Sequence, residues 1–318
     1  IGHIGQDLLM FFIHQKITAS RRRCGRVGLL LVGLMLISTI PHGYATNKLI
    51  NAEQRAKIEN HMGTHWYGVY IFENKGGHAE ISLQKENGLY VVKEELWVEI
   101  KAFGSTQKLI MSSSRYYGVK DGSLVRVHSS FSQDGKTVSA QLEINGNKAQ
   151  LIQRISGEEK TTSVPLPKEH LLDALALSLM NTSTSLPLPS EAIETTLFET
   201  LPPLSKELKL EHKLLKREAR VVDGITLNLT LISTKVPDQG IRYTTLLRDD
   251  GVVMETEMMG MLKLRLEPEP VAKSAGTTPD VLALSLARPD QQITEPRNLA
   301  EMVVRIALPK APPTFTDG

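Results

Sequence analysis

Two pairs of residues in this chain have a spacing that could support chemistry. His61 and His65 lie four residues apart, so one face of a helix could present both imidazoles to a metal ion. No third ligand stands out beside them, and protein zinc sites need at least three protein ligands. His170 lies three residues before Asp173, a spacing typical of a surface pair on a helix. We therefore expect neither a metal site nor a catalytic pair at these positions.

The adjacent carboxylates are also poor candidates for catalysis. Glu94–Glu95 and Asp249–Asp250 fall in segments with strand-like patterns, where neighbouring side chains point to opposite faces. The sequence contains no Gly-x-Ser-x-Gly elbow, no His-Glu-x-x-His motif and no glycine-rich phosphate loop. We expect this chain to hold no catalytic residue and no cofactor site, and not to be an enzyme by itself.

Apolar residues suggest one candidate binding site. Four methionines cluster with alternating leucines over residues 254–266, and methionine adapts to irregular apolar partners. A helix predicted over residues 168–180 carries leucines at helical spacing. An apolar groove between this helix and a sheet would be lined by Leu171, Leu175, Leu179, Met254 and Met258. The alternative is that the methionines fill gaps in an ordinary core.

The segments around these residues alternate with period two. Leu96, Val98 and Ile100 alternate with Trp97 and polar residues, and residues 137–144 repeat the pattern. Xaa-Gly turns separate strands near residues 66–72, 79–83, 89–101, 108–118, 124–132, 137–144, 148–155, 208–222, 225–233, 241–247, 252–257 and 261–266. This rhythm predicts a mainly β fold: a long antiparallel meander forming a curved sheet or half-barrel, with the helix at 168–180 packed on it.

The hairpin turns and the flanking segments are predicted from local composition. Gly76–Gly77 reads as a two-residue turn between the first two strands. Residues 46–64 read as a short N-terminal helix or tether. Residues 181–205, rich in Ser, Thr and Pro, read as a long loop.

The N-terminus has the features of a secretory signal. Arginines at 21–23 and 26 precede an apolar run over residues 27–40, and Gly43 and Ala45 supply small residues for cleavage. Cleavage would remove Cys24, the only cysteine, so the mature chain would have no disulfide and no thiolate. We expect a periplasmic or extracellular protein; an uncleaved N-terminal anchor is the alternative.

These patterns divide the chain into five parts. Residues 1–45 are the signal with an upstream extension, residues 46–64 the helix or tether, and residues 65–270 the β domain. Residues 271–280 read as a linker. Residues 281–318 read as the start of a truncated β unit, which lacks the further strands that its first strands would pair with.

Composition narrows the classes of partner. The formal net charge is +2, and lysines alternate with glutamates in the most basic stretch, so we expect no nucleic-acid binding. Aromatic residues make up 5% of the chain, which argues against a sugar-stacking platform. Contact with a membrane is expected only through the N-terminal segment, if it stays uncleaved.

The order of the patterns resembles a known family. The motifs that carry the resemblance are Trp66-Tyr67-Gly68-Val69-Tyr70, Gly76-Gly77-His78-Ala79, Gly240–Thr244, Asp250–Glu255, the methionine-rich strand ending Leu264–Glu269, and Ile293–Arg297. Together they resemble the N-terminal, non-catalytic region of bacterial secreted transglutaminase-like proteins. In that family a downstream domain carries a cysteine, a histidine and an aspartate for catalysis. The resemblance implies that this chain stops before that domain.

Two functions follow as expectations. The first is an extracytoplasmic, non-catalytic accessory region that binds a protein partner or its own downstream catalytic domain. The second is a standalone periplasmic carrier that holds a lipid between sheet and helix. The meander with one helix is similar to periplasmic lipoprotein carriers, but only as a fold, and a fold does not determine function.

Overall fold

The computed structural model describes residues 49–102, 104–179, 192–222 and 224–280. The chain divides into two units, Ile1–Leu284 and Ser285–Gly318, and every described residue belongs to the first. The predicted signal over 1–45 and the predicted β unit over 281–318 lie outside the described residues. No helix in the described ranges is long and apolar enough to cross a lipid bilayer.

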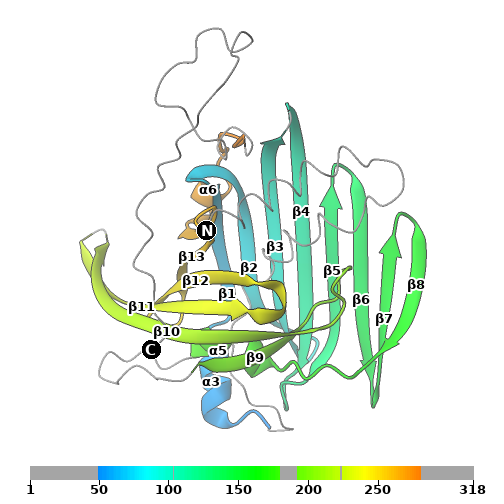
Figure 1. Cartoon of the computed structure of the whole chain (residues 1–318). Coiled ribbons are helices and arrows are strands. Elements are labelled where there is room, and N and C mark those ends of the chain that lie inside the picture. The colour runs from blue at the N-terminus through cyan, green and yellow to red at the C-terminus, as the bar shows by residue number, and fades with distance from the viewer. Residues whose placement is uncertain (1–48, 103, 180–191, 223, 281–318) are drawn as a thin grey trace. The chain divides into compact units, whose positions relative to one another are not determined.

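Fourteen strands form one open antiparallel sheet, which confirms the predicted mainly β fold (Figure 1). Their order across the sheet is β8-β7-β6-β5-β4-β3-β2-β1-β14-β13-β12-β11-β10-β9. The strands are β1 (Gly63–Ile71), β2 (Asn74–Glu86), β3 (Leu89–Ala102), β4 (Ser105–Gly118), β5 (Leu124–Gln133), β6 (Lys136–Asn145), β7 (Lys148–Ile155), β8 (Glu158–Val164), β9 (Ile193–Phe198), β10 (Glu207–Val222), β11 (Ile225–Val236), β12 (Ile241–Arg248), β13 (Val253–Met258) and β14 (Leu262–Glu267).

The sheet consists of two meanders joined in its middle. The first runs from β1 outward to the edge strand β8, and the second runs from the opposite edge, β9, inward to β14. The two meet where β1 pairs with β14, in a register that places Val69 opposite Leu264. The first and last strands of the domain are therefore neighbours.

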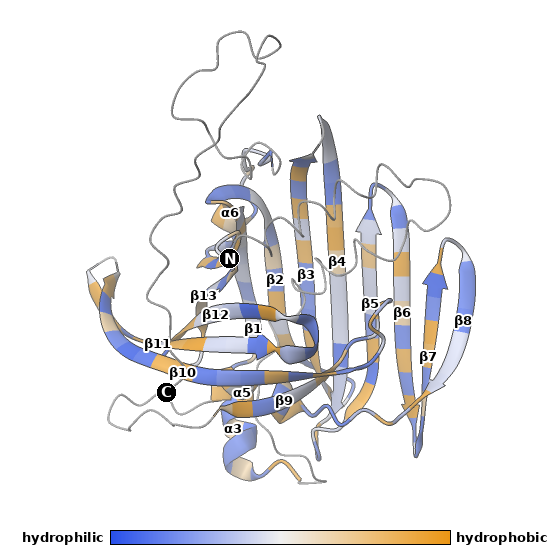
Figure 2. Cartoon of the chain, in the orientation of Figure 1, coloured by the Kyte–Doolittle hydropathy of each residue, from blue (hydrophilic) through white to orange (hydrophobic). Residues whose placement is uncertain are grey.

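Alternating side chains give the sheet two different faces, as the banding of hydropathy along β3 and β4 shows (Figure 2). One face, which we call the inner face, carries the apolar positions such as Val69, Leu96 and Met111, all of them buried. The other, the outer face, carries Trp66 and Trp97, which are half-buried. Successive side chains of a strand point to opposite faces, so the period-two pattern alone decides which residues build the core.

The sheet curves so that its inner face encloses the core. The backbone oxygen of Phe198, on the edge strand β9, lies 3.3 Å from the guanidinium of Arg115 on β4. Beyond β9, Thr200 Oγ1 donates to Ser129 Oγ on β5 at 2.9 Å. Strands far apart in the sheet order thus meet across the inner face, and one apolar cluster includes residues of both meanders.

The crossover between the meanders runs against the inner face. The predicted helix over 168–180 forms two single turns instead, α4 (Leu171–Ala174) and α5 (Ala176–Leu179). The imidazole of His170 accepts from the backbone N–H of Leu172 at 3.0 Å and caps α4. All four residues of α4 are buried, so packing rather than helical continuity determines the path of this segment.

An ion pair in the interior fastens this crossover. Arg115 Nη1 donates to both carboxylate oxygens of Glu169, at 2.9 and 2.7 Å, and both side chains are at most 3% exposed. The same carboxylate accepts from the hydroxyl of Tyr117 at 2.5 Å and from the backbone N–H of Phe198 at 2.7 Å. These bonds join β4, the crossover and β9.

The predicted N-terminal helix is present as α3 (Ala52–Asn60). Asn51 caps it, because the Asn51 side chain accepts from the backbone N–H of Gln54 at 2.8 Å and the Gln54 side chain accepts from the backbone N–H of Asn51.

Most of the predicted turns are correct, but Gly76–Gly77 is not a turn. Both glycines lie inside β2, and the chain reverses at Phe72 and Glu73, whose φ angles are 47° and 65°. The predicted loop over 181–205 contains strand β9, and strand β8 was not predicted at all.

Residues 269–280, which we call the strap, pack against the sheet. They begin with the short helix α6 (Glu269–Ala272). One further helical turn, η1 (Pro237–Gln239), lies between β11 and β12. The backbone N–H of Thr277 donates to the oxygen of Lys75 at 3.1 Å, and the N–H of Lys101 donates to the oxygen of Pro279 at 2.9 Å. Residues 271–280, predicted as a linker, are thus fixed to β2 and β3 over this stretch.

Candidate functional site

The outer face carries a row of large side chains across neighbouring strands. The register places His78 of β2 opposite Trp97 of β3, and Trp97 opposite Ile110 of β4. The imidazole of His78 and the indole of Trp97 are stacked, with ring centroids 4.7 Å apart and planes inclined by 21°. Ile110 remains 41% exposed. These three residues form an apolar, ring-bearing wall on the outer face.

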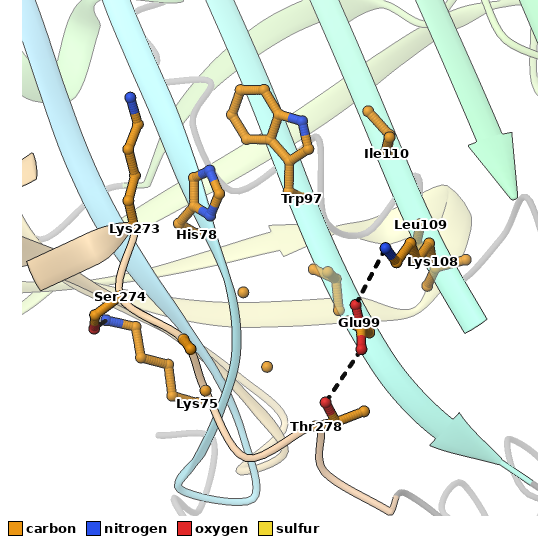
Figure 3. A pocket seen from close by; sticks show the side chains of 15 residues that line it. Lys75, His78, Trp97, Glu99, Lys108, Leu109, Ile110, Lys273, Ser274 and Thr278 are labelled. Carbon is orange, nitrogen blue, oxygen red and sulfur yellow. Dashed lines mark hydrogen bonds and ion pairs between the residues drawn. The ribbon is translucent and has the colours of Figure 1, made fainter. Parts of the chain in front are cut away.

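This wall borders a pocket of about 450 Å³ (Figure 3). Strands β2, β3 and β4 supply its floor, and residues 273–276 and 278 of the strap form its opposite side. Its volume falls within the range of roughly 300–1,000 Å³ that is usual for small-ligand pockets. The polar side chains at its rim are Lys75, Glu99, Lys108, Lys273, Ser274 and Thr278.

Gly276 allows the strap to approach β2 this closely, and Gly77 allows β2 to lie close to β3. A Cβ atom at Gly276 would lie 2.0 Å from the backbone oxygen of Lys75, and one at Gly77 would lie 1.9 Å from the backbone oxygen of Trp97. Real side chains cannot occupy those positions without moving the backbone. Gly76–Gly77, misread as a hairpin turn, therefore has a different role, which is to keep this end of β2 free of side chains.

The lysines of the pocket have different environments. Lys75 is mostly buried and pairs with Glu267 at 2.8 Å, and Glu267 also accepts from the hydroxyl of Tyr70. Burial and this bond raise the pKa of Tyr70 to about 12. Lys273 lies with Nζ 3.9 Å from the centroid of the Trp66 ring and pairs with Glu269 at 2.6 Å.

The part of the rim formed by β3 and β4 is more open. Lys108 is 72% exposed in its side chain, and its Nζ lies 3.7 Å from Glu99. Thr278 donates to the same carboxylate at 3.3 Å (Figure 3). Such an exposed, long ion pair contributes little to stability, so the ammonium of Lys108 is free to exchange partners.

Each of the three lysines that line the pocket has a carboxylate beside it. Lys75 pairs with Glu267, Lys273 with Glu269 and Lys108 with Glu99. Burial lowers the pKa of His78, and the charges of Lys273 and Lys75 lower it further. His78 therefore stays a neutral ring at neutral pH. Lys108, whose ion pair is the longest of the three and whose side chain is the most exposed, is the cation most accessible to an anionic group.

The structure does not bring the predicted groove residues together as an open groove. Leu171, Leu175 and Met258 are buried in the core, and Leu179 and Met254 are half-buried. Among the five, only Leu175 lines the cavity that α4 and α5 form with the inner face of β1, β2, β3, β13 and β14. That cavity is about 70 Å³, far below the roughly 300 Å³ at which small-ligand pockets begin.

His61 and His65 do not share a helix face. His61 follows the last residue of α3 and its Nδ1 lies 2.7 Å from the oxygen of Lys57, whereas His65 belongs to β1. Burial lowers the pKa of His65, and the nearby charge of Arg248 lowers it further. In the part of the chain that the structure describes, no group of three or more His, Cys, Asp or Glu side chains could hold a metal ion.

Sequence reasoning placed the carboxylates correctly but missed a pair across strands. Glu94 and Glu95 take opposite faces of β3, as expected, and Glu95 lies opposite Glu80 of β2 on the outer face. Burial raises the pKa of Glu80, and the charge of Glu95 adds to this rise. His170 and Asp173, expected on the surface, are instead partly and fully buried.

Sequence reasoning also missed the outer-face pocket. One signal was available, because Trp97 stands at a polar position of a clean alternation, where a large ring has no core to enter. The strap could not have been found, since its contacts join residues as much as 202 positions apart, such as Lys75 and Thr277.

Comparison of the chain with models of known protein families, with curated proteins and with solved structures found no match. The functional argument therefore rests on the residues of this chain.

Proposed function

We propose that this chain is an extracytoplasmic, non-catalytic interaction region of a transglutaminase-like protein. It binds a protein partner, or its own downstream catalytic domain, through the outer face of β1 to β4. The observation that carries this proposal is the pocket beside Trp97, a built hollow on the face that does not serve the core.

The composition of the outer face supports a protein partner. Trp66, Tyr70, Trp97 and Tyr116 all lie on it, half-buried and half-accessible. Cations lie over three of these rings: Lys273 over Trp66, Arg265 over Tyr70 and Arg126 over Tyr116. Tryptophan, tyrosine and arginine are the residues that most often carry the binding energy of protein interfaces.

The extracytoplasmic location rests on the signal-like N-terminus and on Cys24 as the only cysteine. The transglutaminase-like assignment rests on the order of sequence motifs. A lipid carrier is less well supported, because the cavity between helices and sheet is too small for an acyl chain.

Cell fractionation tests the location and the domain context. An antibody against residues 65–270 should detect the protein in the envelope or secreted fraction, in a band well above 35.2 kDa. A band in the cytoplasmic fraction would contradict the location. A band below 35.2 kDa would contradict the catalytic domain that this proposal places downstream.

Site-specific cross-linking tests the contact surface. Benzoyl-phenylalanine at Ile110, beside the pocket, should cross-link one defined protein, or the downstream domain of the same chain. The matched control is the same substitution at Ile225, which is 64% exposed at the tip of the β10–β11 hairpin. Equal cross-linking from the two positions would contradict a specific surface.

A further inference from the structure

The pocket on the outer face combines two features. The first is a flat wall made by the stacked rings of His78 and Trp97, continued by the exposed side chain of Ile110. The second is an exposed lysine at the rim, Lys108, whose ion pair with Glu99 is long, at 3.7 Å. A wall of rings prefers a flat or apolar group, and an exposed ammonium prefers negative charge.

Of the three lysines, Lys108 is the one best able to bind a ligand. Lys75 is held between Glu267, the backbone oxygen of Val271 and Ser274. Lys273 pairs with Glu269. Among the described residues, Lys108 has the long 3.7 Å ion pair with Glu99, and its side chain is 72% exposed.

The strap shows that this end of the sheet can hold an extended polypeptide. Residues 276–280 lie along β2 and β3 and exchange backbone hydrogen bonds with Lys75 and Lys101. Hydroxyl groups of Ser274 and Thr278 at the pocket lining offer further polar contacts. Main-chain bonding of this kind supplies affinity without depending on the partner's side chains.

We propose that the pocket binds a polypeptide segment in which an aromatic side chain is flanked by carboxylates. The ring stacks against Trp97 and Ile110, and a carboxylate pairs with Lys108. This inference rests on the proposed function and names the chemistry of the partner.

Three blocked tripeptides test the chemistry. Acetyl-Glu-Phe-Glu-amide carries the ring and the charges, acetyl-Gln-Phe-Gln-amide keeps only the ring, and acetyl-Glu-Ala-Glu-amide keeps only the charges. The chain contains two tryptophans, so Trp66→Phe leaves Trp97 as the only tryptophan reporter. Saturable change of its fluorescence is expected for the first peptide, with a Kd near or below about 1 mM, and at least about tenfold weaker binding for the other two.

Charge reversal at the rim provides the matched comparison. Lys108→Glu should weaken binding of the first peptide at least about tenfold, a change of about 1.4 kcal/mol. Lys136→Glu makes the same charge change at an exposed lysine of β6 outside the pocket and should leave the affinity unchanged. Trp97→Leu, followed by calorimetry, should also abolish binding, and thermal unfolding checks that each variant is folded.

Several results would overturn the inference. They are equal affinity for all three peptides, no saturable binding, equal effects of Lys108→Glu and Lys136→Glu, or tighter binding of an N-acetylglucosamine oligomer than of any peptide. If these peptides fail while cross-linking from Ile110 still captures a protein, the proposed function stands and only its chemistry is wrong. If the peptides bind but the protein is found in the cytoplasmic fraction, the peptide chemistry stands and the proposed extracytoplasmic function is wrong.

Discussion

Arg115 and Glu169 show how a single buried pair can hold distant parts of a chain together. Each is at most 3% exposed, and the carboxylate accepts bonds from the guanidinium, the Tyr117 hydroxyl and the Phe198 backbone. Desolvating two charges costs several kcal/mol, which is offset only when nearly all their polar atoms are bonded. The pair therefore determines where the crossover and β9 lie more than it adds to net stability.

Removing the guanidinium of Arg115 should reveal the cost of burying the Glu169 carboxylate. Arg115→Ala leaves the carboxylate of Glu169 buried without its partner, so we expect the free energy of unfolding to fall by about 3–5 kcal/mol. Urea denaturation measures the change. Arg154→Ala, which removes an arginine from a half-exposed pair with Glu159, should cost less than about 1 kcal/mol. Similar losses in the two variants would show that the buried network is not critical.

The cap of α4 makes the crossover sensitive to pH. His170 accepts from the backbone N–H of Leu172 through Nδ1, while Nε2 bonds to the oxygen of Asp121, so both ring nitrogens are used by the neutral imidazole. Burial lowers the pKa of His170 below its ordinary value of 6.5, although the bond to Asp121 opposes this shift. Protonation at Nδ1 would break the cap.

The sign of the pH effect follows from the lowered pKa. The unfolded chain takes up a proton near pH 6.5, and the folded chain resists protonation until a lower pH. The contribution of His170 to stability is therefore complete above pH 6.5 and is lost as the pH falls through the folded pKa. His170→Asn keeps a capping side chain that does not titrate. The melting temperature of this variant should fall less than that of the wild type between pH 7 and pH 5, and an equal fall would contradict this role.

The strap depends on a glycine rather than on apolar burial alone. Gly276→Val would place side-chain atoms against the oxygen of Lys75, where a Cβ already comes within 2.0 Å. We expect the strap to detach, with faster hydrogen exchange at Thr277 and Lys101 and a red shift of tryptophan emission. Ala275→Val, at the exposed neighbouring position, should leave both unchanged. Unchanged exchange in Gly276→Val would mean that the sheet can move aside.

Local patterns predicted most elements but failed where side chains are buried on several sides of a segment or on none. β4 alternates between buried and accessible positions along most of its length and was predicted easily. β8 lies at the sheet edge with nearly every side chain exposed, so it leaves no alternation to detect. The helix at 168–180 was predicted from leucine spacing. In the fold, however, those leucines are buried on several sides, and a cap at His170 and the core packing replace one continuous helix by two turns.

The candidate site lay beyond prediction because it depends on contacts that are distant in sequence. The aromatic wall depends on the register of three strands. The pocket depends on contacts between β2 and the strap, which follows the last strand of the domain in the sequence. Alternation can place Trp97 on the outer face, but it cannot show which side chain of the next strand stands opposite. The predicted groove illustrates the same limit, since apolar spacing selected Leu171 and Met258 but did not show that both side chains are buried in the core.

Joining the two meanders through β1 and β14 has a consequence for the unfolding of the domain. Six residue pairs, from Trp66 opposite Glu267 to Ile71 opposite Leu262, connect them within the sheet. Across the inner face, the apolar cluster holds Met111 and Leu142 of the first meander together with Leu210 and Tyr243 of the second. Neither meander can bury its inner face without the other, so we expect both to unfold in one cooperative transition.

Native-state hydrogen exchange can test this expectation in the whole protein. The most protected amides of β5 and β12, one strand from each meander, should exchange with the same free energy, equal to that of global unfolding. Leu264→Ala, at the β1–β14 junction, should lower both free energies by the same amount, about 2–5 kcal/mol, because its side chain is buried in the shared core. A variant in which β12 alone loses protection would show two independent units. In that case the fastening of the crossover by Arg115 and Glu169, rather than the shared core, would be what keeps the meanders together.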